Sequence, residues 1–295
     1  MVSKELYPYQ NHYFEHTNKV RQHYIDEGSG DPVVMVHGNP TWSFYFRKLV
    51  DALKDTHRTI VPDHIGCGLS DKPTDALYHY TLKQRVADLT ALLDHLGITK
   101  NITLVLHDWG GMIGMAYASQ FPERVSRIIL SNTAAFHLPS SKPLPLALKI
   151  CRDSAVGSFL VRGLNAFSAS AVKVCAKRRP LEGAVKDAYL SPYHNWDTRR
   201  AVLRFVQDIP LDPKDPSYAI VSKVEETLPE FKNKPMLICW GAKDFVFDDH
   251  FLKVWQEKFP KADVHRFADV GHYVLEDAWE DVVPLVKKFM SETRV

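Results

Sequence analysis

Asp108 stands in a stretch of sequence that could present a nucleophile. In Leu104-Val-Leu-His-Asp-Trp-Gly-Gly111 an apolar run ends, one acidic residue follows, and small residues open a helical pattern. Such a strand–turn–helix sequence is typical of a nucleophile elbow, a sharp turn that exposes one side chain above a sheet. Leu106 stands where these elbows usually have their first glycine, and Asp108 stands in place of the usual serine. Because Asp at the start of a helix is often only an N-cap, this stretch alone leaves both interpretations open.

Two later residues could complete a catalytic triad with Asp108. Asp244 follows one apolar run by a few residues, and His272 follows the last such run of the chain. Nucleophile, acid and histidine then come in the chain order that is known for triads with this kind of elbow. The segments between them are long enough to bring three strand ends to one edge of a sheet. We therefore expect Asp108 to act as nucleophile, His272 as general base, and Asp244 as the acid that orients His272.

A nucleophilic carboxylate is suited to a particular class of substrate. Attack on an ordinary ester would give a reactive mixed anhydride, whereas attack on a saturated carbon that carries a leaving group gives a stable alkyl ester. Water activated by His272 can hydrolyse that ester at the Asp108 carboxyl carbon, and the hydrolysis needs N–H donors for the oxyanion. We expect the backbone N–H groups of Asn39 and Trp109 to form this oxyanion hole. Their side chains add an amide NH2 and an indole N–H, which could hold a departing anion.

The surrounding sequence predicts an α/β fold with a mostly parallel sheet. Short β-branched runs alternate with longer helical patterns, as in βαβ units. Strands are expected at residues 32–36, 58–62, 102–106, 125–130, 236–239 and 264–267, and helices at 82–96, 112–120 and 279–290. Between residues 136 and 216, prolines punctuate short helical pieces and no strand is evident. This pattern predicts a helical cap, or lid, at residues 136–216, inserted into a core domain of residues 1–135 and 217–295.

The motifs resemble those of the haloalkane dehalogenases, a branch of the α/β-hydrolase superfamily. The resemblance is carried by His37-Gly-Asn-Pro-Thr-Trp-Ser43, His107-Asp-Trp-Gly-Gly111 and Gly271-His272, and it extends over nearly the whole chain. It implies an eight-stranded sheet flanked by helices, and hydrolysis of haloalkanes to alcohol and halide through an alkyl-aspartate ester. It also implies that Asn39 and Trp109 bind the halide.

The position of the acid in the chain indicates which dehalogenases the sequence resembles most. Some members of the family carry the acid as a Glu after the sixth strand, and Asn132 holds that position in this chain. This supports Asp244 as the acid. The combination of Asn39 and Trp109 as donors with a late Asp is similar to the third dehalogenase subfamily.

Two further reactions remain open on the same residues. Asn132–Pro139, Arg204–Pro210 and Lys243–Phe247 are similar to the β-lactone decarboxylases of long-chain olefin biosynthesis, in which an aspartate would open a strained lactone and a carboxylate would take the place of the halide. Epoxide hydrolases share the H-G-x-P and H-D-W-G-G motifs, but they usually carry an aromatic residue in place of Asn39. They also need lid tyrosines, for which the chain offers Tyr189, Tyr193 and Tyr218. A receptor or scaffold role is disfavoured, because the whole triad and both anion donors are present together.

Composition excludes several kinds of partner. The 295 residues include 37 Lys and Arg and 35 Asp and Glu, which gives a net charge of +2. This charge is too small to indicate binding of nucleic acid, and no basic block suggests an anionic membrane surface. No run of apolar residues is long enough for a membrane span, no secretory leader is recognisable, and the four scattered cysteines suit reduced thiols. We therefore expect a cytoplasmic protein.

The expected ligands are few. No motif for a metal, a phosphate loop or a dinucleotide is present, so no cofactor is expected. The predicted partners are a small apolar substrate, either a haloalkane or an alkyl β-lactone, and a halide ion. The sequence leaves open whether the chain forms a homo-oligomer or joins a multi-enzyme assembly.

Overall fold

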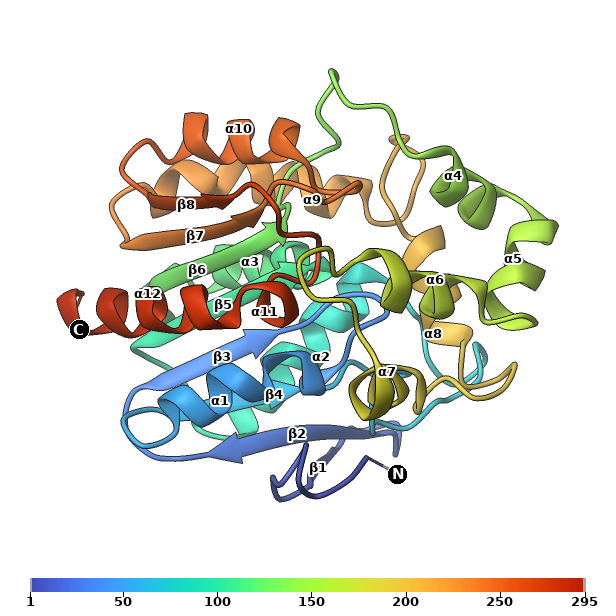
Figure 1. Cartoon of the computed structure of the whole chain (residues 1–295), viewed down its shortest axis with the longest axis horizontal. Coiled ribbons are helices and arrows are strands. Elements are labelled where there is room, and N and C mark those ends of the chain that lie inside the picture. The colour runs from blue at the N-terminus through green and yellow to red at the C-terminus, as the bar shows by residue number, and fades with distance from the viewer. Residues whose placement is uncertain (1, 294–295) are drawn as a thin grey trace.

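A sheet of eight strands forms the centre of the molecule in the computed structural model, which describes residues 2–293 (Figure 1). The strands are β1 (His12–Glu15), β2 (Arg21–Glu27), β3 (Pro32–Val36), β4 (Arg58–Pro62), β5 (Ile102–Asp108), β6 (Val125–Thr133), β7 (Met236–Gly241) and β8 (Asp263–Phe267). Their order is β1-β2-β4-β3-β5-β6-β7-β8. The β1–β2 and β2–β4 pairs are antiparallel and all the others are parallel. The predicted eight-stranded, mostly parallel sheet is confirmed.

Helices cover both faces of this sheet (Figure 1). One face carries α1 (Arg47–Leu53), α11 (Val274–Asp277) and α12 (Trp279–Glu292), and the other carries α2 (Leu82–His95), α3 (Trp109–Gln120), α9 (Tyr218–Thr227) and α10 (Asp249–Lys258). Short 3-10 turns lie at η1 (Ser43–Phe46), η2 (Pro122–Arg124) and η3 (Leu228–Phe231).

Alternate residues of the inner strands pack into two separate hydrophobic clusters. On β3, Val34 and Val36 join the cluster that includes residues of α2, α3, α9 and α10, whereas Val33 and Met35 join the cluster that includes residues of α1 and α12. Successive side chains of a strand point to opposite faces of its sheet, and here both faces are covered. This is why the inner strands are apolar throughout instead of alternating between apolar and polar residues.

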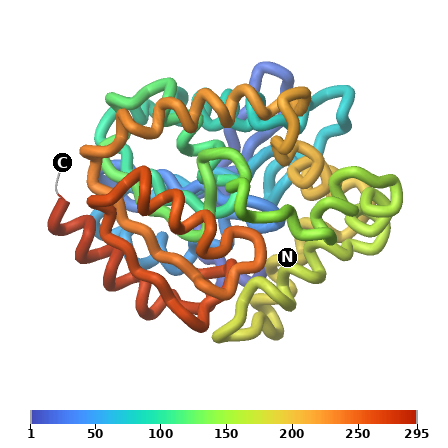
Figure 2. The backbone as a smooth tube through the Cα atoms, turned by 90° about the horizontal axis from the view of Figure 1, so that it is seen from above, coloured from blue at the N-terminus to red at the C-terminus, as the bar shows by residue number. Residues whose placement is uncertain are grey.

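Five short helices follow β6 and stand beyond the carboxyl ends of the parallel strands (Figures 1 and 2). They are α4 (Leu146–Asp153), α5 (Ala155–Arg162), α6 (Ala166–Val174), α7 (Gly183–Leu190) and α8 (Arg200–Gln207). We refer to residues 136–216 as the helical insertion; its division from the core as a separate cap domain stays a prediction. Among residues 2–293, no single helix is long and apolar enough to cross a membrane.

The structure also differs from the elements that were located in the sequence. Neither the antiparallel strands β1 and β2 nor the helices α1, α9 and α10 were located. β2 reads Arg-Gln-His-Tyr-Ile-Asp-Glu and lacks an apolar pattern. β5 and β6 continue through the polar residues at their ends, to Asp108 and Thr133. The helix expected from residue 112 begins at Trp109, directly after Asp108.

Candidate active site

The end of β5 presents Asp108 in a strained conformation. Asp108 is both the last residue of the strand and the N-cap of α3, with a φ of 53° and a ψ of −126°. Residues other than glycine rarely adopt a positive φ, and a sharp turn of this kind is typical of a nucleophile elbow. Its side chain makes no capping hydrogen bond to the helix. Opposite it, Gly38 leaves the necessary room, because a Cβ atom there would overlap the Asp108 carboxylate.

The three predicted triad residues meet at the carboxyl edge of the sheet. Asp244 follows β7 and His272 follows β8, and their side chains are hydrogen-bonded through His272 Nδ1 and Asp244 Oδ2 at 2.6 Å. On the other side of the ring, His272 Nε2 lies 3.6 Å from Asp108 Oδ2. All three residues are buried. The carboxylate on Nδ1 fixes the orientation of the imidazole, so that Nε2 faces the predicted nucleophile.

Charge within the triad changes the basicity of His272. Burial lowers the pKa of the imidazole, but the neighbouring Asp244, through its charge and its hydrogen bond, and then Asp108 outweigh this effect, so that the pKa lies above its ordinary value. For Asp108, burial is the largest influence and raises the pKa of the carboxyl, while His272 and two backbone N–H groups act in the opposite direction. The two neighbouring carboxyl groups therefore favour the imidazolium form of His272, whereas burial disfavours the charged form of Asp108.

One donor of the predicted oxyanion hole already contacts Asp108. The backbone N–H of Asn39 donates to Asp108 Oδ1 at 2.6 Å, and the backbone N–H of Trp109 also acts to lower the pKa of this carboxyl. The other oxygen, Oδ2, is the one near His272. Oδ2 is thus the oxygen with the freedom to attack, and Oδ1 can remain in the hole and become the carbonyl oxygen of an ester.

A single apolar cavity of about 390 Å³ lies above this carboxylate, and Asn39, Asp108, Trp109 and His272 all line it. Most of its wall is apolar and comes from the helical insertion, with Leu148, Phe167, Ala171 and Val174 among the lining residues. Asn39 Nδ2 donates to Val202 O at 3.1 Å. An amide NH2 has two hydrogens, so one donor of Asn39 remains for a ligand beside the Trp109 indole. Four of the five predicted site residues therefore line one apolar chamber, and the fifth, Asp244, stands behind His272.

The peptide group between Gly38 and Asn39 is held from both sides. His37 Nε2 accepts the N–H of His64 at 3.1 Å, which leaves the proton on Nδ1, and Nδ1 donates to Gly38 O at 2.8 Å. The N–H of the same peptide group is the Asn39 donor to Asp108. Burial lowers the pKa of His37, in keeping with a neutral ring. His37 thus orients the peptide group whose N–H belongs to the predicted oxyanion hole.

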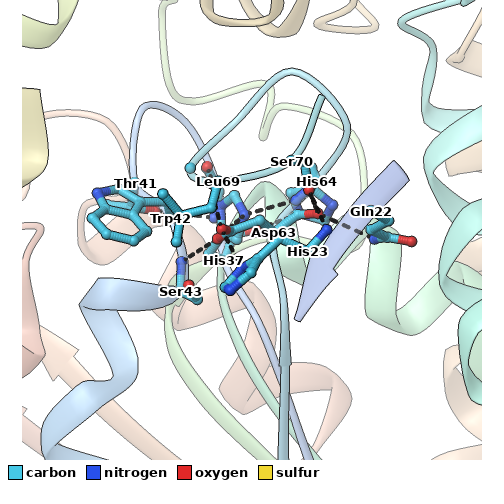
Figure 3. A network of polar contacts seen from close by, with 12 residues as sticks. Gln22, His23, His37, Thr41, Trp42, Ser43, Asp63, His64, Leu69 and Ser70 are labelled. Atoms are coloured by element: carbon cyan, nitrogen blue, oxygen red, sulfur yellow. Dashed lines mark hydrogen bonds and ion pairs between the residues drawn. The ribbon is translucent and has the colours of Figure 1, made fainter. Parts of the chain in front are cut away.

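Asp63 holds this loop in place through a network of buried polar contacts (Figure 3). Its Oδ1 accepts the Ser43 N–H at 2.6 Å, and its Oδ2 accepts from His23 Nδ1 and the Leu69 N–H, both at 2.8 Å. Burial acts to raise the pKa of Asp63, but the charge and hydrogen bond of His23 bring it down to about 2. Asp63 is therefore ionised and joins β2, β4 and the segment before α1.

Asp277 is a further organising residue that the sequence analysis missed. It is fully buried on α11, and its carboxylate accepts the N–H groups of Gly271 and Lys177 at 2.7 Å, of Arg179 at 2.9 Å and of Arg178 at 3.1 Å. It thereby connects the loop of His272 to the helical insertion. The signal in the sequence is an adjacent Glu-Asp pair in the otherwise apolar stretch that follows His272.

Asn132 occupies the end of β6, where some dehalogenases carry their acid. Its Nδ2 donates to Gly241 O at 2.9 Å and to Phe247 O at 3.0 Å, and its Oδ1 accepts the Gly241 N–H at 2.7 Å. Gly241 and Phe247 flank Asp244 in the chain. Asn132 is therefore a clamp on the loop that carries Asp244.

The three tyrosines considered for epoxide opening point elsewhere. Tyr189 donates to Glu276 at 2.6 Å, Tyr193 donates to Thr41 O at 3.4 Å, and Tyr218 stacks on His137. None of the three is among the described residues that line the cavity. This arrangement counts against an epoxide hydrolase.

Comparisons with known proteins agree with this architecture. A family model of the alpha/beta hydrolase fold matches residues 31–278. The cis-3-alkyl-4-alkyloxetan-2-one decarboxylase of Shewanella oneidensis is 59% identical over 288 residues, which cover 98% of this chain and 90% of the relative. Haloalkane dehalogenase 2 of Mycobacterium tuberculosis is 30% identical over 275 residues, which cover 93% of this chain and 92% of the relative. The crystal structure of a haloalkane dehalogenase from Agrobacterium tumefaciens superposes with a TM-score of 0.85 at 25% identity, covering 97% of each chain.

The decarboxylase is therefore much more similar in sequence than the dehalogenase, although the dehalogenases share the whole fold. The motifs alone had favoured dehalogenation, because Asn39, Trp109 and the triad suit a halide as well as a carboxylate leaving group. The chain belongs to the alpha/beta hydrolase fold family, near to the oxetanone decarboxylases and further from the haloalkane dehalogenases.

Proposed function

We propose that this chain converts cis-3,4-dialkyl oxetan-2-ones, which are β-lactones, into alkenes and carbon dioxide through a covalent ester of Asp108. The choice of substrate is carried by the 59% identity to an oxetanone decarboxylase over 98% of the chain, against 30% for a dehalogenase. The apolar cavity above Asp108 supports it, since two alkyl groups need apolar walls around one small polar ring.

The first step opens the strained ring. Asp108 Oδ2 attacks the ring carbon that carries the ring oxygen, and the bond between this carbon and the oxygen breaks. The oxygen keeps the electron pair and becomes part of a free carboxylate. The remaining amide N–H of Asn39 and the indole N–H of Trp109 are the donors available to this new anion. The product of the step is an alkyl ester of Asp108 with a carboxylate on the neighbouring carbon.

The second step releases the alkene. The bond between the neighbouring carbon and its carboxylate breaks, carbon dioxide leaves, and the electron pair forms the double bond. The ester bond breaks at the same time and returns the electron pair to Asp108 Oδ2. No water and no proton are consumed. An imidazolium at His272, 3.6 Å from Oδ2, would stabilise the charge that returns to Asp108.

Haloalkane hydrolysis is the second candidate, and the shared fold and the Asn39–Trp109 pair favour it. The first step would be the same, with a halide as the leaving group. A simple alkyl ester has no neighbouring carboxylate to lose, so its release needs water and a neutral His272 as base. The two candidate reactions therefore differ in what they demand of His272.

The test is a direct comparison of the two substrates on the purified chain. A cis-3,4-dialkyl oxetan-2-one and a 1-bromoalkane of similar length are each incubated with the enzyme, and alkene, carbon dioxide, alcohol and bromide are measured. We expect alkene and carbon dioxide in equal amounts from the lactone, and at most slow bromide release. Asp108→Asn should lose at least about a thousandfold in rate, because an amide is a poor nucleophile. Asp249→Asn changes an exposed acid and serves as the control.

Bromide release that is faster than alkene formation would overturn the proposal in favour of dehalogenation. Hydrolysis of the lactone to a hydroxy acid, without alkene, would overturn it as well. Full activity of Asp108→Asn, with the mass of the amide intact, would remove the covalent route.

A further inference from the structure

Large apolar side chains are exposed on three consecutive helices of the helical insertion. Of the eleven large apolar side chains that are exposed within residues 2–293, six lie between residues 146 and 174. They are Leu146, Ile150, Val156, Phe159, Leu164 and Val174, which we call the apolar tip. Leu146 is 71% exposed and Val156 65% exposed. Single exposed apolar residues are ordinary, but such a concentration on one part of a surface indicates an interaction site.

The helices that carry the apolar tip extend from the outermost part of the molecule back toward the core. α4 and α5 lie at the end of the helical insertion that is farthest from the sheet, and α6 returns toward the carboxyl ends of the strands (Figures 1 and 2). α4 packs against α5, and α5 packs against α6, so the tip is carried by one contiguous group of helices. Nothing in the described part of the chain covers these six side chains.

The same segment carries a strong positive charge. Residues 138–179 contain eight Lys and Arg but a single acidic residue, Asp153. The chain as a whole has a net charge of only +2, so the rest of the molecule is negative. The small net charge of the whole chain therefore hides a separation of charge between the helical insertion and the core.

Three of these cations lie on the helices that carry the apolar tip or shortly after them. Lys149, Lys173 and Lys177 are exposed, and none of them forms an ion pair within residues 2–293. On α4, Leu146 is followed by Lys149 three residues later and by Ile150 four residues later. These spacings put all three residues on one side of the helix. Lys173 precedes Val174 on α6. Lysine stems can lie along an apolar surface while the ammonium groups reach outward.

The apolar tip is also continuous with the cavity above Asp108. Ile150 and Val174 are exposed and line the cavity, and so does Phe245, which is 44% exposed on the loop after β7. An apolar path thus runs from the surface of the tip to the chamber that contains the triad. An apolar compound could follow this path without entering water.

We propose that the apolar tip docks on the surface of an anionic lipid bilayer, with its side chains among the acyl chains and Lys149, Lys173 and Lys177 at the headgroups. The combination of exposed Leu, Ile and Phe with a basic segment is typical of helices that lie in a membrane interface. α5 and α6 are bent by 69° relative to each other, so this pair lies on the surface as two short segments. The docked molecule would exchange apolar substrate and product directly with the bilayer.

The test measures binding to vesicles and does not depend on the reaction. The full chain is sedimented with vesicles of phosphatidylcholine alone and of phosphatidylcholine with phosphatidylglycerol. We expect binding on the order of tenfold tighter when phosphatidylglycerol is present, and weaker binding at high salt. Phe159→Ser combined with Leu164→Ser should weaken binding to both vesicles, and Lys149→Gln combined with Lys173→Gln should remove only the preference for the anionic lipid.

Matched controls lie outside the helical insertion. Leu77→Ser removes another exposed apolar side chain, and Lys83→Gln with Lys232→Gln removes two exposed lysines from the core. Both controls should bind vesicles like the unchanged chain. Absence of vesicle binding, or equal loss in the controls, would overturn the proposal. A change from dimer to monomer in the Phe159→Ser, Leu164→Ser variant, without vesicle binding by the unchanged chain, would instead identify the tip as a contact between copies.

Discussion

At the scale of single residues, the two oxygens of the Asp108 carboxylate have different neighbours. Oδ1 accepts the Asn39 N–H, while Oδ2 lies near His272 Nε2. The bond to substrate would therefore form and break at Oδ2, directly beside the imidazole. What His272 contributes then depends on its protonation state, and the two candidate reactions ask for opposite states.

Replacing His272 should separate the two reactions. In His272→Phe, the ester formed from a 1-bromoalkane should persist, because no base activates water, and release should stop at about one bromide per active site. The ester formed from a β-lactone should still break down by losing carbon dioxide, so turnover should continue at a reduced rate. Intact-protein mass spectrometry should detect the alkyl group on the Asp108 peptide only with the bromoalkane. Arrest with both substrates would mean that alkene release also needs His272 as a base.

The dependence on pH should have opposite signs for the two substrates. The pKa of His272 is raised in the folded chain, so the imidazolium persists above its ordinary range and is lost as the pH rises further. Alkene formation should fall through this transition, whereas ester hydrolysis should rise through it, because a base must be neutral. The measurement is the rate against pH for each substrate. Asp244→Asn should move both midpoints to lower pH, since it removes the main group that raises the pKa.

At the scale of elements, the bounds of strands that are buried on both sides were the easiest to predict. β3 and β4 have their expected bounds, since continuous apolar runs between polar turns have no other stable location. β8 is a partly exposed edge strand, and it begins one residue before its expected start. β2 could not be predicted, because its polar side chains are buried by partners distant in sequence, such as Asp63 with His23. The residues proposed for the triad and for the two donors could be singled out because each follows a strand. Asp277 could not, since its partners are backbone N–H groups, which any sequence supplies.

Asp277 should influence both the stability of the fold and the position of His272. Asp277→Asn retains the shape but replaces one acceptor oxygen by an NH2 group that faces N–H donors. Each buried donor left without a partner costs about 1–3 kcal/mol, and a displaced His272 loop should lower kcat by about tenfold. Urea unfolding and steady-state kinetics measure the two effects. Asp281→Asn, on an exposed ion pair with Arg178, should change neither by much.

At the scale of the whole molecule, a buried ion pair helps to join the helical insertion to the core. Glu276 on α11 accepts hydrogen bonds from Arg47 of α1 and, at 2.6 Å, from Tyr189 of α7. The Trp42 indole adds a bond to Ala188 O at 3.2 Å. The Asp277 carboxylate is a second buried link, whereas the ion pair of Arg178 with Asp269 is more exposed. The attachment should therefore depend mainly on the buried contacts.

Removing the charge of Glu276 should be costly for this reason. Glu276→Gln keeps the size of the side chain but leaves the buried Arg47 guanidinium without its carboxylate. We expect a loss of about 3 kcal/mol in the free energy of unfolding. Arg178→Gln, which breaks an exposed pair, should cost less than about 1 kcal/mol. Equal losses in urea unfolding would mean that the exposed pairs contribute as much as the buried one.

The hydrogen bonds of Asn132 restrict how the predicted catalytic acid could have moved during evolution. Relatives that carry the acid after the sixth strand differ from this chain by more than an exchange of two side chains. An acid at position 132 would lose both donors of the amide and would face the carbonyl oxygens of Gly241 and Phe247, which now hold the Asp244 loop. If residue 132 changed first, the loop of Asp244 would lose its hydrogen bonds while Asp244 still served as the acid. The new acid at position 132 would not yet be able to replace it. An intermediate of lower fitness therefore separates proteins with the acid after β6 from proteins with the acid after β7. We expect the position of the acid to change only rarely between the branches of the family.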